Sequence, residues 1–589
     1  RVGAQEQATA PPRRTRTFAV TVGVHALRPF GTVQADGHEA ADADPDEESS
    51  PRTSRWWGVA LFASTATFYF GVGALLILRY NVFDPDAPSR VANAGLTFMS
   101  RYPPLSAIGF VWNPMPSLVE IPFVWLSQWW PPLRTRALAG TVQSALFMAG
   151  AVVMLRVIAI DRGMSSGWRR LAIAGFALHP VIIVYAQSGL SEAAEIFSLL
   201  WAVRYLLRWM DSRLPKDLTW AGIALAVGYL SRYEIVVATA GAVALVGVIA
   251  IFRSPAGQRL TSTAIPVMVL VLPIAATFVV WAIIGWVLAG ELFAQLSSRY
   301  GNAAQVANWV EANGNVRPAF AAWPVIAGRL LGTQPLVLVA AGIAVAIGVF
   351  RKRYDLLVPV VTMGPILAFA AYGQHAPTTF GFVRFYITAI PLVTCIAILC
   401  WIPSDDSNAF AGARRIGMAL CASIFLTMPI TAVAMRDPSI GDTQIQLGVT
   451  SVLFPDKTHS QDSWYRRLNI NESETAKFLD DQHLEPGTVL MDTANTWGIW
   501  LRSNNPKQFV LTSDYDFTVK LNRPWNLGVK YIVVTAPDNY NADAVAIRYP
   551  KMWENGAGIG IPVLSVADAK GYDAYRIFQV VKPPERARP

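Results

Sequence analysis

Long runs of apolar residues with almost no charge recur along the chain as far as residue 435. Each run is close to the roughly 20 residues that an α-helix needs to cross the hydrocarbon core of a bilayer. About eleven such segments are predicted to be transmembrane helices, at 56–79, 137–159, 171–187, 190–209, 217–233, 235–252, 261–289, 324–350, 355–372, 383–402 and 415–435. The pattern therefore predicts an α-helical polytopic membrane protein.

One further apolar segment, residues 114–130, reads PMPSLVEIPFVWLSQWW. It is short, contains three prolines and a glutamate, and ends in paired tryptophans, which favours a segment lying at the membrane interface. Leaving it out of the spans places nearly all arginine-rich loops on the same side as the N-terminus, as the positive-inside rule requires. The N-terminus is therefore expected in the cytoplasm of a cell-membrane protein, and a long first loop, residues 80–136, on the outer side.

Beyond residue 435 the apolar runs shorten to strand-like segments separated by Gly, Pro and Asn. Strands are predicted at TVLMDT, QFVLTSD, VKYIVVT and YRIFQVV. A helix is predicted at NESETAKFLDDQ, where Asn471 and Glu474 have the spacing of a capping box. We therefore predict three parts: a disordered cytoplasmic arm at 1–55, a transmembrane domain at 56–435 and an extracytoplasmic α/β domain at 436–589.

Composition agrees with this organisation, because 53% of the residues are hydrophobic and only 15% are charged. The net charge of +9 does not indicate a nucleic-acid partner, since the region after residue 435 has 17 Lys and Arg against 18 Asp and Glu. The excess lies in the membrane part, where cytoplasmic loops are expected to be basic. The three cysteines, Cys395, Cys400 and Cys421, fall in apolar runs, and we interpret them as buried apolar residues.

With this topology, the unusual polar residues of the membrane part gather on the outer side. They are Asp84, Asp86 and Arg90 in the first loop, Ser191, Glu192 and Glu195 at one turn, Arg232, Tyr233 and Glu234 at the next, and His375, Arg384 and Tyr386 in a later loop. Singly, each has a structural interpretation as a helix-end ion pair or a turn residue. Their convergence on one face favours a functional site.

These residue types suit the transfer of a sugar from a lipid-linked donor. A carboxylate can take the proton of the attacking acceptor hydroxyl, and arginines can hold the phosphate that leaves. Two other classes stay open: a transporter or flippase of a lipid-linked saccharide, and a non-catalytic envelope-assembly scaffold. Clustering of the charges on one face, rather than at the midplane where transporters bind their substrates, counts against the transporter.

The chain resembles the GT-C superfamily of integral-membrane glycosyltransferases. A long first loop that opens with an acidic motif precedes many helices and a soluble C-terminal domain. Two strings, YAQSGLSEAAEIFSLLWAVRYLLRW and GFVRFYITAIPL, are similar to the Ser-Glu turn with its helix and to the late Arg-aromatic stretch of these enzymes. The resemblance covers roughly residues 56–435. It implies a polyprenyl-phosphate sugar donor, a bacterial cell-envelope glycan or glycolipid as acceptor, and inversion at the anomeric carbon.

Carried over to this sequence, the resemblance implies Asp86, or else Asp84, as the general base. Arg384, with Arg232 as a second candidate, would bind the donor phosphate, and Glu192 would position the acceptor or the base. The predicted substrate-binding residues are Glu192, Arg384, Arg232, Glu234, His375 and Arg90. A divalent cation, Mg²⁺ or Mn²⁺, between Asp84 and Asp86 is kept open. The expected partners are the donor, the acceptor and membrane lipids, and not nucleic acid.

Overall fold

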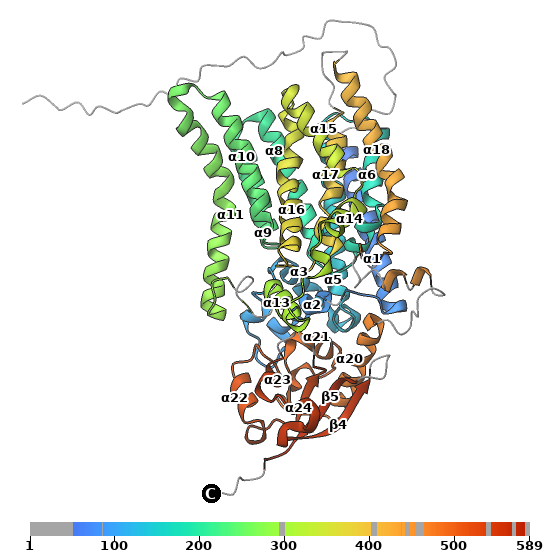
Figure 1. Ribbon diagram of the computed structural model, residues 1–589, viewed down its shortest axis with the longest axis vertical. Helices are drawn as coiled ribbons and strands as arrows, with labels where there is room; N and C mark the ends of the chain where they lie inside the picture. Colours follow the sequence, from blue (N-terminus) through green and yellow to red (C-terminus); the bar gives the residue numbers. More distant parts are fainter. Residues whose placement is uncertain are drawn as a thin grey trace, which may run out of the picture. The chain divides into compact units, whose positions relative to one another are not determined.

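The computed structural model describes residues 51–84, 86–293, 298, 301–401, 409–437, 439–441, 448–450, 452–454, 464–537, 543–567 and 573–583. Residues 1–50, most of the predicted cytoplasmic arm, lie outside the described residues. The chain is helical as far as Ala434 and mixed α/β from Trp464 onward (Figure 1). This confirms the predicted fold class of a multi-pass helical membrane protein with a C-terminal α/β region. Residues 55–589 form one compact unit.

Six helices contain stretches long and apolar enough to cross a membrane. They are α1 (Pro51–Tyr80), α5 (Leu138–Asp161), α10 (Ile235–Arg253), α11 (Arg259–Ala289), α16 (Leu357–His375) and α18 (Ala409–Ala434). Two bent pairs would add one span each, namely α6 (Ser166–Ala177) with α7 (Pro180–Ala186), and α14 (Trp323–Thr333) with α15 (Val337–Phe350). The described residues thus contain six to eight candidate spans.

The other three predicted spans are also helical, but they are too short or too polar to meet these criteria. They are α8 (Glu192–Ser212), α9 (Pro215–Tyr229) and α17 (Ala389–Leu399), which follows the 3₁₀ turn η6 (Val383–Tyr386). All 11 positions of α17 are buried. A helix enclosed by other helices does not need the length of a lipid-facing one, so the figure of about eleven spans stays a prediction.

The first loop is itself helical and holds α2 (Asp86–Met99), α3 (Met115–Trp125), the 3₁₀ turn η2 (Leu126–Gln128) and α4 (Pro132–Thr135). The segment predicted to be interfacial forms α3 and η2. It exposes Trp125, Leu126, Trp129 and Trp130. Exposed tryptophans are typical of segments at a membrane–water interface. A short helix, α13 (Asn302–Ala312), lies in the connection between α11 and α14.

The C-terminal region is built on a five-stranded sheet of order β2-β1-β3-β5-β4 within the described residues. The strands are β1 (Val489–Leu490), β2 (Phe509–Val510), β3 (Tyr531–Thr535), β4 (Gly560–Ala567) and β5 (Asp573–Val580). β1 pairs in parallel with β2 and β3, and β5 pairs antiparallel with β3 and β4. The helices are α20 (Trp464–Asp481), α21 (Trp497–Arg502), α22 (Phe517–Asn522), α23 (Ala544–Arg548) and α24 (Met552–Asn555).

Two details of this region differ from the prediction. The capping box at Asn471 is wrong, because α20 already begins at Trp464 and Asn471 lies inside it. Leu468 packs against the core that the α/β domain shares with α2, so tertiary contacts extend the helix upstream of the local signal. Strand β4 is not predicted from the sequence, because GIPVLSVA shows no alternation of apolar and polar residues and includes Pro562.

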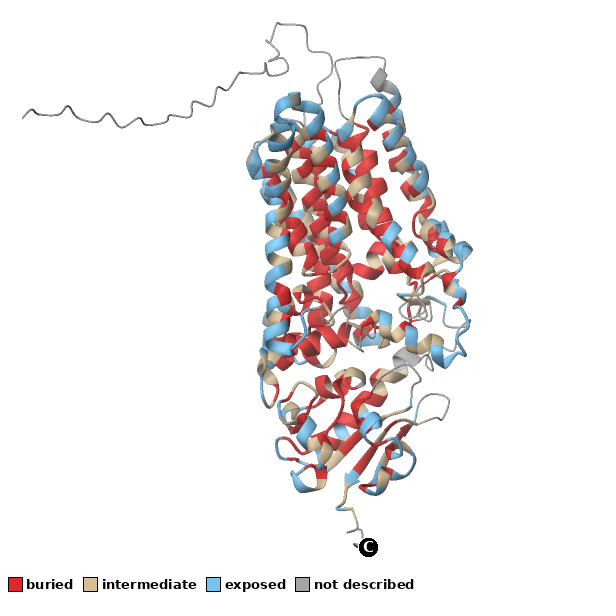
Figure 2. Ribbon diagram, turned by 60° about the vertical axis from the view of Figure 1, so that its left-hand side comes forward, coloured by how far each residue is buried: buried red, intermediate tan, exposed pale blue. Residues whose placement is uncertain are grey.

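The α/β domain packs directly on α2, and buried residues of both share one hydrophobic core. Buried segments, drawn red, occur in both the helical part and the α/β part (Figure 2). The ring of Trp500 lies so close to Gly95 that a Cβ added there would be 2.8 Å from it. Arg134 donates to the carbonyls of Trp500 and Ser503 at 3.3 and 3.0 Å, and Arg101 forms an ion pair with Asp514 at 3.0 Å. The domain therefore fixes the position of α2, the helix that begins at Asp86.

Helices α10 and α16 approach each other closely at Gly241. A Cβ added at Gly241 would lie 1.8 Å from the carbonyl oxygen of Val361, which belongs to the backbone of α16. We expect Gly241→Ala to destabilise the protein by about 1–3 kcal/mol, because a helix backbone cannot withdraw without moving its neighbours. Gly364→Ala is the control, since nothing lies within 4 Å of its added Cβ, and it is expected to be neutral or slightly stabilising. A lower Tm in detergent for Gly241→Ala alone would bear this out, and equal values would contradict it.

Candidate active site

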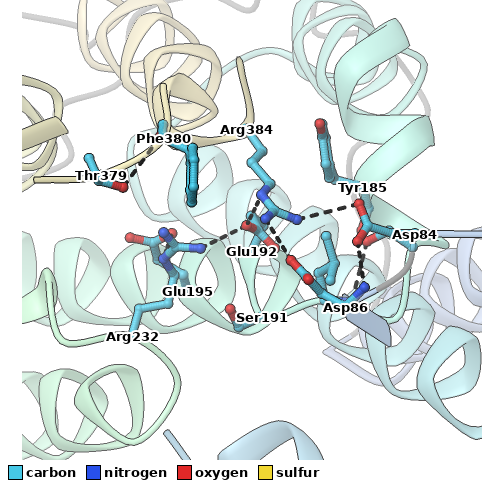
Figure 3. Close-up of polar contacts among 12 residues, drawn as sticks. Asp84, Asp86, Tyr185, Ser191, Glu192, Glu195, Arg232, Thr379, Phe380 and Arg384 are labelled. Atoms are coloured by element: carbon cyan, nitrogen blue, oxygen red, sulfur yellow. Dashed lines mark hydrogen bonds and ion pairs between the residues drawn. The ribbon is translucent and has the colours of Figure 1, made fainter. Parts of the chain in front are cut away.

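Segments far apart in the sequence meet at the guanidinium of Arg384 (Figure 3). Its Nη2 lies 2.8 Å from Oδ2 of Asp86, and its Nη1 lies 3.4 Å from Oδ2 of Asp84. Its Nε lies 3.7 Å from Oε1 of Glu192. Arg384 belongs to η6, the aspartates open the first loop, and Glu192 is the first residue of α8. The structure thus brings together four residues predicted from the sequence.

Arg232 forms a second centre beside the first one. It lies in the turn between α9 and α10, and its Nη1 is 2.7 Å from the same Oε1 of Glu192. Its Nη2 is 2.8 Å from Glu234 and its Nε is 3.3 Å from Glu195. Glu192 is therefore shared by both arginines. We call these residues, Asp84, Asp86, Glu192, Glu195, Glu234, Arg232 and Arg384, the carboxylate–arginine cluster.

Local structure explains why the aspartates turn toward Arg384. The carboxylate of Asp84 accepts the N–H of Asp86 at 3.0 Å, and the carbonyl of Asp84 accepts the N–H of Ala87 at 3.1 Å. This turn starts α2 with Asp86 as its first residue. An aspartate in the first helical turn is favoured by the helix dipole. Glu192 and Glu195 occupy the first turn of α8 in the same way, three residues apart and hence on one face.

The carboxylates of the cluster differ in how far their side chains are exposed to solvent. The side chain of Asp86 is 28% exposed, whereas that of Asp84 is fully buried and that of Glu192 nearly so. A general base must reach the hydroxyl of an incoming acceptor. The exposed side chain of Asp86 is therefore better placed for this role than the buried side chain of Asp84. The preference for Asp86 made from the sequence is therefore consistent with its position.

Two phenylalanines, which the sequence analysis did not single out, hold the arginines in place. The Cζ of Arg384 lies 4.7 Å from the ring centre of Phe382 and 5.6 Å from that of Phe385. The Cζ of Arg232 lies 5.2 Å from the Phe385 ring. Such cation–π contacts favour a desolvated guanidinium. The signal was present in the string GFVRFYITAIPL, where aromatic residues flank the arginine.

Arg90 lies beside the cluster rather than in it. Its Nη2 is 3.4 Å from Oγ of Ser191, and its guanidinium lies 5.0 Å from the Trp112 ring centre. Glu120 of α3 is fully buried, and neither of its carboxylate oxygens has a hydrogen-bond partner among the described residues. Burial raises the pKa of Glu120 well above its usual range, and the charge of Arg90 opposes this shift. Glu120 is not predicted as a site residue from the sequence, because the segment around it has the pattern of an interfacial one.

His375 does not join the cluster and takes part in a different contact. Its ring stacks on Trp323 at a centroid distance of 4.4 Å. Its Nδ1 lies 2.9 Å from Nη2 of Arg317 and 3.0 Å from the carbonyl oxygen of Ala321. The structure therefore places His375 in the packing of the loop before α14, and the predicted contact with phosphate or acceptor has no support in this geometry.

The residues proposed to hold a divalent cation do not fit one as they are arranged. Asp84 and Asp86 both direct a carboxylate oxygen to Arg384, so a guanidinium occupies the position where a cation would bridge them. Within the described ranges, no group of three or more His, Cys, Asp or Glu side chains is arranged to hold a metal ion. The cation stays a prediction from the sequence, and no step of the chemistry is derived through it. The cysteines are free and buried, as interpreted.

Comparison with solved structures finds matches at low identity that cover most of this chain. ArnT from Cupriavidus metallidurans is 14% identical with a TM-score of 0.47, and the match covers 90% of this chain and 98% of that one. The oligosaccharyltransferase AglB from Archaeoglobus fulgidus, in complex with an inhibitory peptide and a dolichol-phosphate, is 12% identical with a TM-score of 0.42, and the match covers 91% and 75%. No protein-family model and no curated protein sequence matches the chain. At such identities the likeness concerns the fold and says nothing of the reaction.

Proposed function

We propose that the protein is a membrane glycosyltransferase that moves a sugar from a polyprenyl-phosphate donor to a cell-envelope glycan or glycolipid. The observation that carries this proposal is the meeting of Asp86 with Arg384, at 2.8 Å, in a site that three distant segments build. A partly exposed carboxylate beside a guanidinium provides a proton acceptor and an anion-binding group side by side. Transfer from a phosphate-linked sugar requires both groups.

In the proposed reaction, the acceptor hydroxyl attacks the anomeric carbon and its proton passes to the carboxylate of Asp86. A new C–O bond forms while the bond between the anomeric carbon and the phosphate oxygen breaks. The electron pair stays on the phosphate, which leaves as an anion and needs no general acid. Arg384 stabilises the charge that develops on this leaving group. Attack from the face opposite the phosphate inverts the anomeric carbon.

The excess of carboxylates in the cluster suggests how donor binding would prepare the base. Arg232 faces Glu192, Glu195 and Glu234, so it mainly holds these three side chains. Arg384 is the arginine paired with the exposed Asp86, and a donor phosphate would compete with Asp86 for it. Once the phosphate takes the guanidinium, the carboxylate of Asp86 is released from its ion pair with Arg384. Asp86 is thus free to accept a proton when donor is bound.

The proposal places the site and the α/β domain on the outer side and the N-terminus in the cytoplasm. Helix α8 supports this orientation, because Glu192 begins it while Arg204 and Arg208 lie toward its other end. These arginines pair with Asp161 and Asp217. Basic residues are enriched on the cytoplasmic side of membrane proteins, which supports an outward orientation of the site end of α8 in this proposal.

The first experiment is a transfer assay with membranes containing the wild-type protein. A panel of radiolabelled polyprenyl-phosphate sugars would be offered with envelope glycan acceptors, and nucleotide sugars would serve as control donors. We expect labelled product only from a lipid-phosphate donor. Movement of a lipid-linked saccharide across proteoliposomes without transfer would instead favour a transporter. If the protein neither transfers a sugar nor moves a lipid-linked saccharide with any donor of the panel, the non-catalytic scaffold is the class that remains.

Chelation should leave this transfer unchanged. Because Arg384 already pairs with Asp84 and Asp86 and can take over the role of a cation at the phosphate, we expect the same initial rate in excess EDTA. The measurement is a comparison of rates with EDTA, with EDTA plus Mg²⁺, and with EDTA plus Mn²⁺. A rate abolished by EDTA and restored by one of the metals would contradict the expectation and support the cation kept open from the sequence.

A further inference from the structure

A groove of about 530 Å³ lies where the first loop meets the α/β domain. Arg136 lines it from the end of α4, Lys477 and Asp481 from α20 and its end, and Arg502 and Asn504 from α21 and the residues after it. None of these residues belongs to the carboxylate–arginine cluster. Two parts of the chain, more than 300 positions apart in sequence, are needed to form the groove.

Several polar groups of the groove have no partner of opposite charge. Among the described residues, Arg136, Lys477 and Asp481 form no ion pair, whereas Arg502 is paired with Glu472 at 2.7 Å. Asp480 is occupied, because its carboxylate accepts from Ser503, from the N–H of Asn504 and from Gln508. Lys477, Asp481 and Asn504 are exposed. The groove thus offers donors and acceptors of both signs to a ligand.

This mixture of charges selects the kind of ligand. A phosphate or carboxylate ligand would face Asp480 and Asp481, and a cation would face Arg136 and Lys477. A neutral molecule rich in hydroxyl groups avoids both conflicts, since each hydroxyl donates one hydrogen bond and accepts others. We propose that this groove binds a neutral oligosaccharide stretch of the acceptor glycan, away from the hydroxyl that reacts. This inference rests on the proposed function.

Hydrogen bonds connect the groove to the start of the first loop. Arg136 donates to Oδ1 of Asn81 at 3.0 Å, and Asn469 of α20 donates to the same oxygen at 3.2 Å. Arg502 in turn donates to Asn469 at 2.8 Å. Asn81 has a left-handed backbone, with φ of 55°, and lies three residues before Asp84. A glycan bound in the groove would therefore rest against residues that hold the turn leading to Asp84 and Asp86.

The test is binding of full-length protein in nanodiscs to an array of neutral and phosphate-bearing envelope oligosaccharides. Lys477→Ala and Asp481→Ala alter the groove, and Lys507→Ala and Glu485→Ala are controls at exposed positions outside it. We expect wild type and controls to bind neutral oligosaccharides, and each groove variant to bind about tenfold more weakly, as for the loss of a hydrogen bond to a charged group.

Three results would overturn the inference: no neutral oligosaccharide binds wild type, the groove variants bind like the controls, or phosphate-bearing glycans are preferred. The same panel in the transfer assay separates this failure from failure of the proposed function. Asp86→Asn should bind glycans like wild type but transfer sugar about 10²- to 10⁴-fold more slowly. If binding depends on the groove but the protein never transfers sugar, the groove proposal stands and the proposed glycosyltransferase function fails. If transfer depends on Asp86 but neither binding nor transfer depends on the groove, the proposed function stands and the groove proposal fails.

Discussion

Asp86→Asn is expected to lower the rate of sugar transfer by about 10²- to 10⁴-fold, the usual contribution of a general base. The amide has the same size as the carboxylate but cannot accept the proton of the acceptor hydroxyl. It retains an oxygen that can face Arg384, which lies 2.8 Å from the carboxylate in the wild type. The loss should therefore appear in kcat, and the KM for the donor should not rise, because the neutral amide competes with the donor phosphate for Arg384 less than the carboxylate does. Initial rates at several donor concentrations, at matched protein levels, measure both.

Two variants make this result specific. Asp211→Asn is the control for losing a carboxylate, because Asp211 also pairs with an arginine, Arg162, and its side chain is 64% exposed near the far end of α8. It should transfer like wild type. Asp84→Asn should lose less kcat than Asp86→Asn, since Asp84 is fully buried and supports the turn before α2. If Asp84→Asn abolished sugar transfer and Asp86→Asn retained it, Asp84 rather than Asp86 would be the general base. Activity kept in both would exclude a first-loop base.

Much of the site could be predicted because its residues stand out against apolar surroundings. Glu192, Arg232 and Arg384 are ionisable residues next to long uncharged runs, and such residues are rarely placed there without a partner or a function. The pairing itself could not be predicted. That Glu192 lies between both arginines depends on how η6, α8 and the turn after α9 pack, and no local pattern encodes that distance.

The points on which the structure adds to or departs from the sequence pattern have the same origin. His375 looked like a site residue because a histidine in a loop is available for binding, yet stacking on Trp323 places it elsewhere. Glu120 looked like part of an interfacial segment, but packing of α3 buries it completely. In the fold, α17 was predicted as a span by its apolar run, and it proves to be an enclosed helix. Local hydrophobicity predicts that a segment is helical, whereas its neighbours decide how long and how exposed it has to be.

Arg384 should be the most sensitive position of the cluster after Asp86, because it faces carboxylates on two sides. In Arg384→Ala, the buried carboxylates of Asp84 and Glu192 lose a counter-charge, and removing one partner of a buried ion pair typically costs about 3–5 kcal/mol. We expect a clearly lower Tm together with undetectable transfer. Alone, that result would not separate folding from chemistry.

Arg384→Lys separates the two effects. Lysine keeps the positive charge near Asp84 and Asp86 but loses the planar fork that contacts a carboxylate and a phosphate at two points. We expect a nearly normal Tm, a donor KM raised at least tenfold and a lower kcat, because the ammonium can hold the phosphate only as a point charge. Arg162→Lys, at the opposite end of the helices and paired with Asp211, should change neither value. If Arg384→Lys binds and transfers like wild type, the donor phosphate lies elsewhere and the guanidinium serves only to neutralise the carboxylates around it.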